Sequence, residues 1–478
     1  MDNLKKTRVI VTLIITSIMA LMLLVLLSVF LSQKVLVVGD RSPFQTIQEA
    51  VTAADPGDII FVTPTLSPYE ENVTIGANKD RLKLIGIGNP IIDGSTLAEG
   101  LNGITVTDSS HVKIKGFIVR DFKDDGTLTN GGIVINPNST HNLVSGNNVI
   151  NIGAEGISFN SSSNNIAILN NISRNGDDGI LLDTSTDNFL IANRSNENVD
   201  EGISVDFASN NNFILGNQNI RNRDNSIFVV GSNNNTLLLN IAAKSQSDDG
   251  IQLSGSSENV LLLNKVVNNE EDGIRLFSES DENIIVGNYI VNNGLEDEEP
   301  SGHGVFLGSQ TNSNIILGNI VKKNRDDAIF IDTEGNNHHI VGNIVKENNG
   351  DGILLDGEVG MESNNNTINR NVIVENEGDG IEVNTFSFSN ILEGNKVSKN
   401  VENGILLDEE ANNNRVKGNF IFKNQLNGIF LETQSFENDI LFNISFFNDL
   451  FDIQDDGFDN EFNGNICGIS DPNFICTN

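Results

Sequence analysis

Residues Asn314–Asn337, NIILGNIVKKNRDDAIFIDTEGNN, are one copy of a unit that fills most of the chain. As a template the unit reads N-x-Φ-x-x-N-x-Φ-x-x-N-x-x-D-G-I-x-Φ, where Φ is aliphatic and Ala328 replaces the usual glycine. The aliphatic residue after the glycine recurs from Ile133 to Ile453, mostly every 23 or 24 residues, with two longer steps. A fixed period of this length is the signature of a solenoid.

Three columns of asparagine run through the repeats, five residues apart within each unit, as at Asn314, Asn319 and Asn324. The apolar pieces between them are too short for helices, and their x-Φ-x alternation has the period of a strand. Asparagine tolerates left-handed backbone angles, which suits it to tight corners, and stacked asparagines hydrogen-bond along a ladder. The pattern predicts an all-β fold, a right-handed parallel β-helix of about 14 coils of 23–24 residues with Φ inward.

The N-terminal segment predicts export across a membrane. Residues 9–31 carry no charge and follow Lys5, Lys6 and Arg8. This stretch is longer than the apolar core of a signal peptide and long enough to span a bilayer. We expect an anchor in the cell membrane with everything after it outside the cytoplasm. A cleaved signal, leaving a secreted protein, is the alternative.

The rest of the chain divides by composition. The expected segments are residues 1–33 as anchor or signal, 34–125 as N-terminal cap and first irregular coils, 126–460 as the β-helix repeats, and 461–478 as a C-terminal cap. Within the N-terminal cap, Ser42–Ala54 predicts a short amphipathic helix, with Ser42 as its N-cap. In the C-terminal cap, Cys467 and Cys476 are the only cysteines, and export permits a disulfide between them.

The run Phe44–Ile75, FQTIQEAVTAADPGDIIFVTPTLSPYEENVTI, resembles the entry to pectin-lyase-like β-helix proteins. The repeats are similar to those of the carbohydrate-binding and sugar-hydrolase superfamily, NosD-like proteins included. The resemblance covers nearly everything after residue 34 and implies the same fold. It does not choose among lyases, hydrolases, epimerases and non-enzymes. A NosD-like copper role would need clusters of His and Met, which five His and four Met, mostly dispersed, do not form in the sequence.

The charge balance narrows the choice of partners. The chain has 29 Lys+Arg against 65 Asp+Glu, a formal net charge of −36. This argues against nucleic acid and anionic lipid surfaces, and against a polyuronate unless a cation bridges the two. Cell-wall polycations or Ca²⁺ fit the charge better. The alternative is that the charge only keeps a long rod soluble.

The residue before the glycine of each repeat is usually acidic, and we call this position the acidic column. Its acidic members are Glu155, Asp178, Glu201, Asp249, Asp272, Asp327, Asp351 and Asp379, and His303 stands in the same column. On stacked coils, neighbours in the column would lie about 4.8 Å apart. Carboxylates this close repel unless they are solvated, protonated or shared with a cation.

Two interpretations of the acidic column follow. The first is a Ca²⁺ site, because Ca²⁺ prefers oxygen ligands. Its candidate ligands are Asp178, Asp249, Asp272, Asp327 and Asp351. The second is that Asp-Gly is turn chemistry at exposed, solvated corners.

One irregular coil suggests where catalysis would occur. Its segment SGHGVFLGS, residues 301–309, is similar to the G-H-G-x-x-x-G-S segment of polygalacturonases. By that likeness Asp249, Asp272 and Asp327 are acid/base candidates with His303 supporting them, although the repeat itself explains the Gly-Val pair and other elements of that family are missing. A pectate-lyase-like mechanism would instead use Arg275 as base, with carboxylates holding Ca²⁺.

Two functions therefore remain. The leading hypothesis is an anchored or secreted extracellular β-helix that binds or scaffolds at cell-surface polysaccharide without catalysis. The alternative is a polysaccharide lyase, glycoside hydrolase or epimerase with its site at Asp249, Asp272, Arg275, His303 and Asp327. The absence of Trp and the presence of only two Tyr count against a sugar cleft, whereas Phe306, Phe330 and Leu354 predict an outward apolar stripe beside His303.

Overall fold

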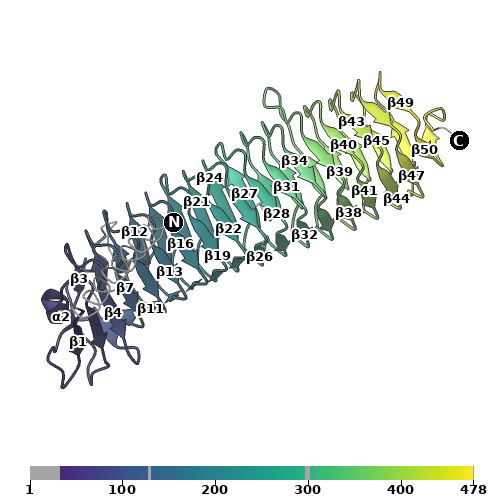
Figure 1. The fold of residues 1–478 in the computed structure, drawn as a ribbon. Helices are drawn as coiled ribbons and strands as arrows, with labels where there is room; N and C mark the ends of the chain where they lie inside the picture. Colours follow the sequence, from purple (N-terminus) through teal and green to yellow (C-terminus); the bar gives the residue numbers. More distant parts are fainter. Residues whose placement is uncertain (1–32, 127–130, 296–301, 477–478) are drawn as a thin grey trace, which may run out of the picture.

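The computed structural model describes residues 33–126, 131–295 and 302–476. The chain winds into a rod of parallel strands, with the N-terminal coils at one end and the C-terminal coils at the other (Figure 1). The predicted all-β, right-handed parallel β-helix is confirmed. Each coil contacts only its two neighbours, so the stability of the rod comes from repeated contacts between adjacent coils.

One coil contains three short strands, one from each of three sheets. The coil that contains His303 begins with β30 (Val305–Leu307) in sheet C and continues with β31 (Ile315–Leu317) in sheet A and β32 (Ile320–Lys322) in sheet B. The next coil begins with β33 (Ile329–Ile331), which pairs with β30 in parallel. The asparagine-rich corners separate the strands, as the spacing of the columns predicts.

The three sheets run the length of the rod. Sheet A extends from β1 (Val35–Val38) to β49 (Glu461–Asn463) and has 18 strands. Sheet B extends from β5 (Ile91–Asp93) to β50 (Ile466–Cys467) and has 16. Sheet C extends from β3 (Val73–Ile75) to β51 (Ser470–Asp471). The rod has more coils than the repeats alone predict, because the irregular N-terminal coils stack in the same register.

The core is a column of aliphatic side chains inside the coils. The inward residues Ile329, Ile331, Ile316 and Val321 are fully buried, as are their equivalents along the rod. Inward and outward residues alternate in each strand, which is the pattern that predicted the strands. Burying this apolar surface is the main favourable contribution to folding.

The asparagine columns form the predicted ladders, and these are buried. Asn319 Oδ1 accepts the backbone N–H of Asn288 at 2.8 Å and the side-chain N–H of Asn288 at 3.0 Å. The side-chain N–H groups of Asn319 donate to the carbonyl oxygen of Ile285 at 2.9 Å and to Asn343 Oδ1 at 3.0 Å. Each amide thus satisfies backbone groups at a corner where no strand pairing does so.

The left-handed residue at each corner is not the ladder asparagine, contrary to the sequence interpretation. The residues directly before the ladder asparagines have φ values of 58° at Ser313, 63° at Gly318 and 55° at Lys323. This backbone turn directs the following side chain into the coil, where its amide reaches the next coil. Asparagine is required there for its donor and acceptor atoms, not for its backbone preference.

The one helix among the described residues, α2 (Ile47–Ala53), is shorter than the predicted Ser42–Ala54 and is capped by Thr46 instead of Ser42. Phe44 forms a bridge to the end of β1, which holds the residues before the helix in an extended form. The Glu71 carboxylate accepts the first two backbone N–H groups of the helix, at 2.7 and 2.9 Å. The helix therefore begins where its orphan N–H groups find acceptors.

The two ends of the chain can be described only in part. A disulfide joins Cys467 and Cys476, whose Cα atoms are 5.6 Å apart. No helix in the described ranges is long and apolar enough to cross a membrane. Residues 9–31 lie outside those ranges, so the membrane anchor stays a prediction.

The ladder predicts a large effect of removing one amide. Asn319→Ala leaves the buried N–H of Asn288 without its acceptor, and an unsatisfied buried group costs about 1–3 kcal/mol. Because several hydrogen bonds disappear together, we expect the unfolding free energy to fall by at least about 2 kcal/mol. Urea denaturation of the full chain in mild detergent, followed by circular dichroism, measures it. The control Asn349→Ala changes an exposed asparagine, so its unfolding free energy should stay within about 0.5 kcal/mol of wild type. An equal loss of unfolding free energy in both variants would contradict the ladder's role.

Candidate functional site

The acidic column lies at the entry to the strands of sheet C, and it is buried. Asp249 is 0%, Asp272 1% and Asp327 6% exposed. The interpretation of these residues as solvated corners is therefore wrong. They are covered because the coils on both sides stack against them, which a single repeat does not reveal.

The column carries a ladder of its own. Asp249 Oδ1 accepts the N–H of Asp272 at 2.8 Å, and Asp272 Oδ1 accepts the N–H groups of His303 at 2.7 Å and Gly302 at 2.9 Å. Asp327 Oδ1 accepts the N–H of Asp351 at 2.6 Å. One oxygen of each carboxyl is thus committed to the backbone of the next coil.

Four of the five residues predicted for a catalytic site lie in one row, the acidic column, on successive coils, and Arg275 lies beside that row. Arg275, in β27 (Ile274–Phe277), places Nη1 3.6 Å from Asp272 Oδ2, and its guanidinium carbon lies 4.8 Å from the ring centroid of Phe306. The His303 ring lies 5.6 Å from the Phe306 ring. The arrangement brings together a cation, an imidazole and an aromatic ring on the outer face of sheet C.

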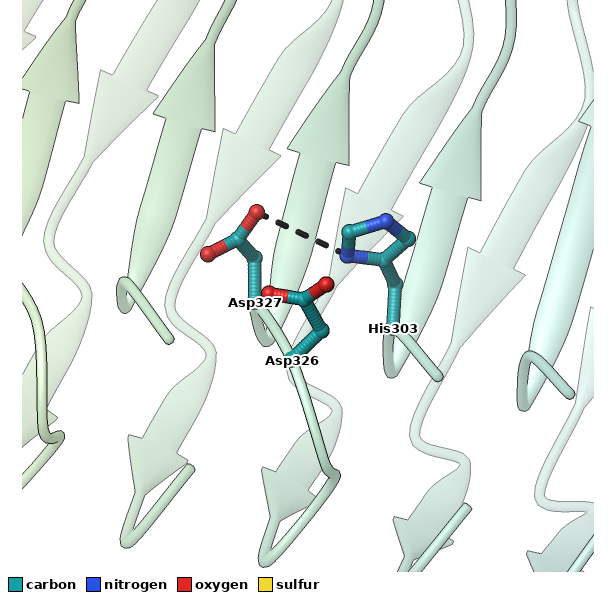
Figure 2. A group of neighbouring side chains, drawn as sticks. All are labelled: His303, Asp326 and Asp327. Atoms are coloured by element: carbon teal, nitrogen blue, oxygen red, sulfur yellow. Dashed lines mark ion pairs between the residues drawn. The ribbon is translucent and has the colours of Figure 1, made fainter. Parts of the chain in front are cut away.

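His303 also contacts the following coil. Its ring lies 4.9 Å from that of Phe330, and its Nδ1 lies 3.5 Å from Asp327 Oδ2 (Figure 2). Asp249 stands at the other end of the row, next to Asp272. The sequence therefore identified residues that are neighbours in space.

Burial and mutual repulsion alter the acid–base properties of the row. Burial, and then the charges of Asp272 and Asp248, raise the pKa of Asp249 well above its ordinary value. Burial, with Asp351 and Asp326, raises the pKa of Asp327 to about 8. In both cases the shift favours the protonated form of the carboxyl.

Arg275 keeps its charge in this environment. Burial alone would lower the pKa of its guanidinium, but the charges of Asp249, Asp272 and Glu271 raise that pKa above its ordinary value. A guanidinium with a raised pKa does not accept a proton at neutral pH, so Arg275 is suited to binding an anion or a hydroxyl group and not to acting as a general base.

The five residues predicted as Ca²⁺ ligands do not form one site. They lie on different coils, and all except Asp272 belong to separate groups of close side chains in the described part of the chain. The groups are Asp177, Asp178 and Asp200; Asp200, Glu201 and Asp224; Asp248, Asp249 and Glu271; His303, Asp326 and Asp327; and Asp351, Asp379 and Glu382. Within each group the potential ligand atoms lie within 4.8 Å of one another.

In most groups, the acid that directly precedes the column residue was not predicted from the sequence. Asp177, Asp200, Asp248 and Asp326 each directly precede a member of the acidic column. The signal for them was the paired acid before the glycine, as in DDG and DEG. We interpreted only the second acid of each pair.

The group of Asp351, Asp379 and Glu382 shows how strongly such acids interact. Burial and the neighbouring Asp351 raise the pKa of Asp379 to about 8. Burial and a hydrogen bond with Asp351 raise the pKa of Glu382 to about 10. Carboxyls of this kind share protons instead of ionising together.

These shifts predict that stability falls as the pH rises. The folded protein holds a proton on Asp379 that the unfolded chain releases above about pH 4, so the stabilisation is complete below that pH and is lost as the pH rises through about 8. We expect the wild-type melting temperature to drop between pH 6 and 9, roughly the range of that loss. Asp379→Asn keeps the acceptor oxygen without the charge and should show a smaller drop.

Asparagine already occupies the acidic column at Asn225, Asn403 and Asn427, so the repeat tolerates this substitution. Asp187→Asn, at an exposed corner, is the control and should follow the wild-type curve. Differential scanning calorimetry across the pH range measures all three proteins. Identical slopes for Asp379→Asn and wild type would contradict the raised pKa.

Comparison with known families supports the fold. The family described as "Right handed beta helix region" matches residues 170–310, 219–368 and 302–445, which together span more than half of the chain. The family described as "Periplasmic copper-binding protein (NosD)" matches residues 66–212. The second match agrees with an extracytoplasmic β-helix. No curated protein sequence matches the chain significantly.

The described residues of the NosD-like stretch do not fit a copper site. Its two histidines, His111 and His141, are exposed and stack with their ring centroids 4.9 Å apart and their planes 7° from parallel. Imidazole lone pairs lie in the ring plane, so stacked rings do not aim two of them at one ion. No methionine or cysteine lies within residues 66–212, and the metal-ligand groups of the described residues there contain only carboxylates.

Solved structures with a related fold have diverse descriptions. PfbA, a surface adhesin of Streptococcus pneumoniae, is 12% identical over 70% of this chain and 87% of its own, with a TM-score of 0.45. DFA-IIIase from Arthrobacter chlorophenolicus A6 is 12% identical over 86% and 94%, with a TM-score of 0.42. The Dettilon tailspike protein is 16% identical over 72% of this chain, with a TM-score of 0.37. The match covers 61% of the tailspike's own length.

At these identities and TM-scores, the solved structures carry no information about function. The family match and the coil-on-coil pairing of parallel strands agree independently. The chain belongs to the right-handed β-helix family.

Proposed function

We propose that the protein is an extracytoplasmic β-helix that binds a surface polysaccharide along the outer face of sheet C without cleaving it. One observation carries the proposal. Arg275, Phe306, Phe330 and Leu354 are register partners on four successive strands, so they form a continuous outward row. All four are half-buried, which leaves part of each side chain accessible.

The chemistry of this row suits a sugar polymer. The faces of Phe306 and Phe330 offer apolar surface to the C–H faces of sugar rings, and Arg275 offers a planar set of N–H donors to their hydroxyl groups. Equivalent side chains recur at one strand spacing, about 4.8 Å. A repeating polymer lying along the rod would meet one of these side chains on each of the four coils.

The charge of the protein selects among glycans. A formal charge of −36 disfavours polyanions, nucleic acid among them, and favours a neutral or cationic polysaccharide. We further propose that residues 9–31 anchor the chain in the cell membrane, which would hold the rod outside the cytoplasm beside such a polymer.

The burial of the carboxyls favours binding over catalysis. A general acid or base must come within hydrogen-bonding distance of the reacting bond. Asp249 and Asp272 are at most 1% exposed, and each has an oxygen bound to the next coil. A polymer on the outer face would contact Arg275 and the rings instead. The alternative, a lyase, glycoside hydrolase or epimerase using these acids, would have to rearrange this ladder.

The row predicts a loss of glycan binding when its rings are removed. We expect the full chain to bind immobilised chitosan or a neutral β-glucan in surface plasmon resonance, and to bind alginate less tightly in the absence of divalent cations. The double substitution Phe306→Ala and Phe330→Ala should weaken binding at least about tenfold, because each ring contact contributes about 1 kcal/mol.

Phe189→Ala is the matched control, since Phe189 forms a comparable ring pair with Phe213 on sheet A, with centroids 6.1 Å apart. It should leave binding unchanged. Equal weakening in both variants, or none in the double variant, would refute the proposed surface. Release of shortened or unsaturated sugars by the wild-type protein would favour the enzyme alternative.

A further inference from the structure

Three potential metal ligands meet at the entry to β30 and β33. His303 precedes β30, and Asp326 and Asp327 precede β33 on the next coil. Their ligand atoms lie within 4.8 Å of one another. Figure 2 shows the imidazole and the two carboxylates directed toward a common point. We call these three residues the His303 cluster.

The side chain of His303 takes no part in the hydrogen-bond ladder that the neighbouring acids of the column form. The residue is only 5% exposed, yet its Nδ1 has no hydrogen-bond partner. His338, the other buried histidine of the described chain, behaves differently. It replaces an asparagine of a corner ladder, and its Nδ1 accepts the N–H of Asn314 at 3.1 Å. The ladder therefore explains His338 but not His303.

The spacing within the cluster matches two ligands of one metal. His303 Nδ1 and Asp327 Oδ2 are 3.5 Å apart without forming a hydrogen bond. Two ligand atoms bound tetrahedrally to Zn²⁺, each about 2.0–2.1 Å from the ion, lie about 3.4 Å from each other. Asp327 Oδ1 is held by the N–H of Asp351 at 2.6 Å, which leaves Oδ2 directed at His303.

We propose that His303, Asp326 and Asp327 bind a divalent transition-metal ion, of which Zn²⁺ is the best fit. One imidazole nitrogen with two carboxylate oxygens gives three protein ligands, the number found in zinc sites that keep a fourth position open, and imidazole favours a transition metal. Ca²⁺ is the poorer fit, because it takes six to eight oxygen ligands and rarely nitrogen. Asp326 is only half-buried, so the remaining position would be accessible to water from its side.

The backbone leaves room for the two carboxylates. A Cβ at Gly350 would lie 2.4 Å from Asp327 Oδ1 and 2.8 Å from Asp326 Oδ1. The paired-acid pattern of the repeats would place another acid at this position, where the chain has glycine. The absence of a side chain there keeps Asp326 and Asp327 in their places beside the imidazole.

A cation would also relieve the repulsion within the cluster. Asp327 has two other acids beside it: Asp326, whose ligand atom lies within 4.8 Å, and Asp351, whose N–H it accepts at 2.6 Å. Arg275, the nearest cation on the preceding coil, is engaged by Glu271 and Asp272 at 3.5 and 3.6 Å. A bound metal would supply a positive charge among these carboxylates.

This site is independent of the proposed glycan binding, although His303 contacts the rings of Phe306 and Phe330. The metal is therefore measured without any polysaccharide. Calorimetric titration of the full chain, in mild detergent and stripped with a chelator, is carried out with ZnCl₂ and with CaCl₂. Titration with CoCl₂ followed by visible absorption reports on the ligand set.

We expect one tight Zn²⁺ site per chain that excess CaCl₂ does not displace. His303→Asn should weaken it at least about tenfold, since even the loss of an outer-shell partner costs 10–100-fold. Asparagine occupies the same column in three other coils, so this variant should fold. His338→Asn, which restores the asparagine of its ladder, should bind Zn²⁺ as wild type does.

The proposal is overturned if wild type binds no stoichiometric Zn²⁺, or if His303→Asn binds it as tightly as wild type does. It is also overturned if Ca²⁺ displaces Zn²⁺ at equal concentration, because the ligands would then be the carboxylate groups elsewhere in the column. A Co²⁺ spectrum that changes in His303→Asn but not in His338→Asn supports direct ligation by His303. Circular dichroism melting curves confirm that each variant is folded.

Discussion

The rest of the structure depends on the buried amide at each corner of the coil. A corner interrupts the strands and leaves backbone N–H and C=O groups without pairing, deep between stacked coils. Asparagine both accepts and donates, and Asn319 does both, bonding to the coil before it and the coil after it. Aspartate would accept but not donate when ionised, and it would bring a charge into the interior. The neutral amide therefore allows tight corners to be stacked along the whole rod.

The acidic column performs a more limited task, which explains its more varied composition. At the entry to sheet C the side chain needs only to accept an N–H from the next coil, so aspartate and asparagine both serve. The consequence is a row of buried carboxyls whose charges repel one another. Asp327 and Asp379 have pKa values of about 8, and Glu382 has one of about 10. The formal charge of −36 therefore overstates the negative charge of the folded protein near neutral pH.

Departures from the repeat identify the region of interest on sheet C. His303 occupies a column position without joining its ladder, and Arg275 places a guanidinium 4.8 Å from the ring centroid of Phe306. Stability alone does not require either residue, because the repeat has simpler solutions on neighbouring coils. Such breaks in local consistency are expected where a protein serves a function. The two proposals use different parts of this region. Polysaccharide binding uses the outer row from Arg275 to Leu354, and the metal site uses the buried side chains beneath it.

The sequence by itself determined the architecture, because the period of the repeat and the alternation within each strand fix which side chains point inward and which residues stack. It also determined that Asp249, Asp272, Arg275, His303 and Asp327 are neighbours, since equal positions in successive repeats lie one strand spacing apart. Only the tertiary structure decided that the acidic column is buried, that the residue before each ladder asparagine is the left-handed one, and that Asp326 joins His303. Burial and side-chain direction depend on the backbone of the adjacent coil, and one repeat does not encode how closely the next one packs against it.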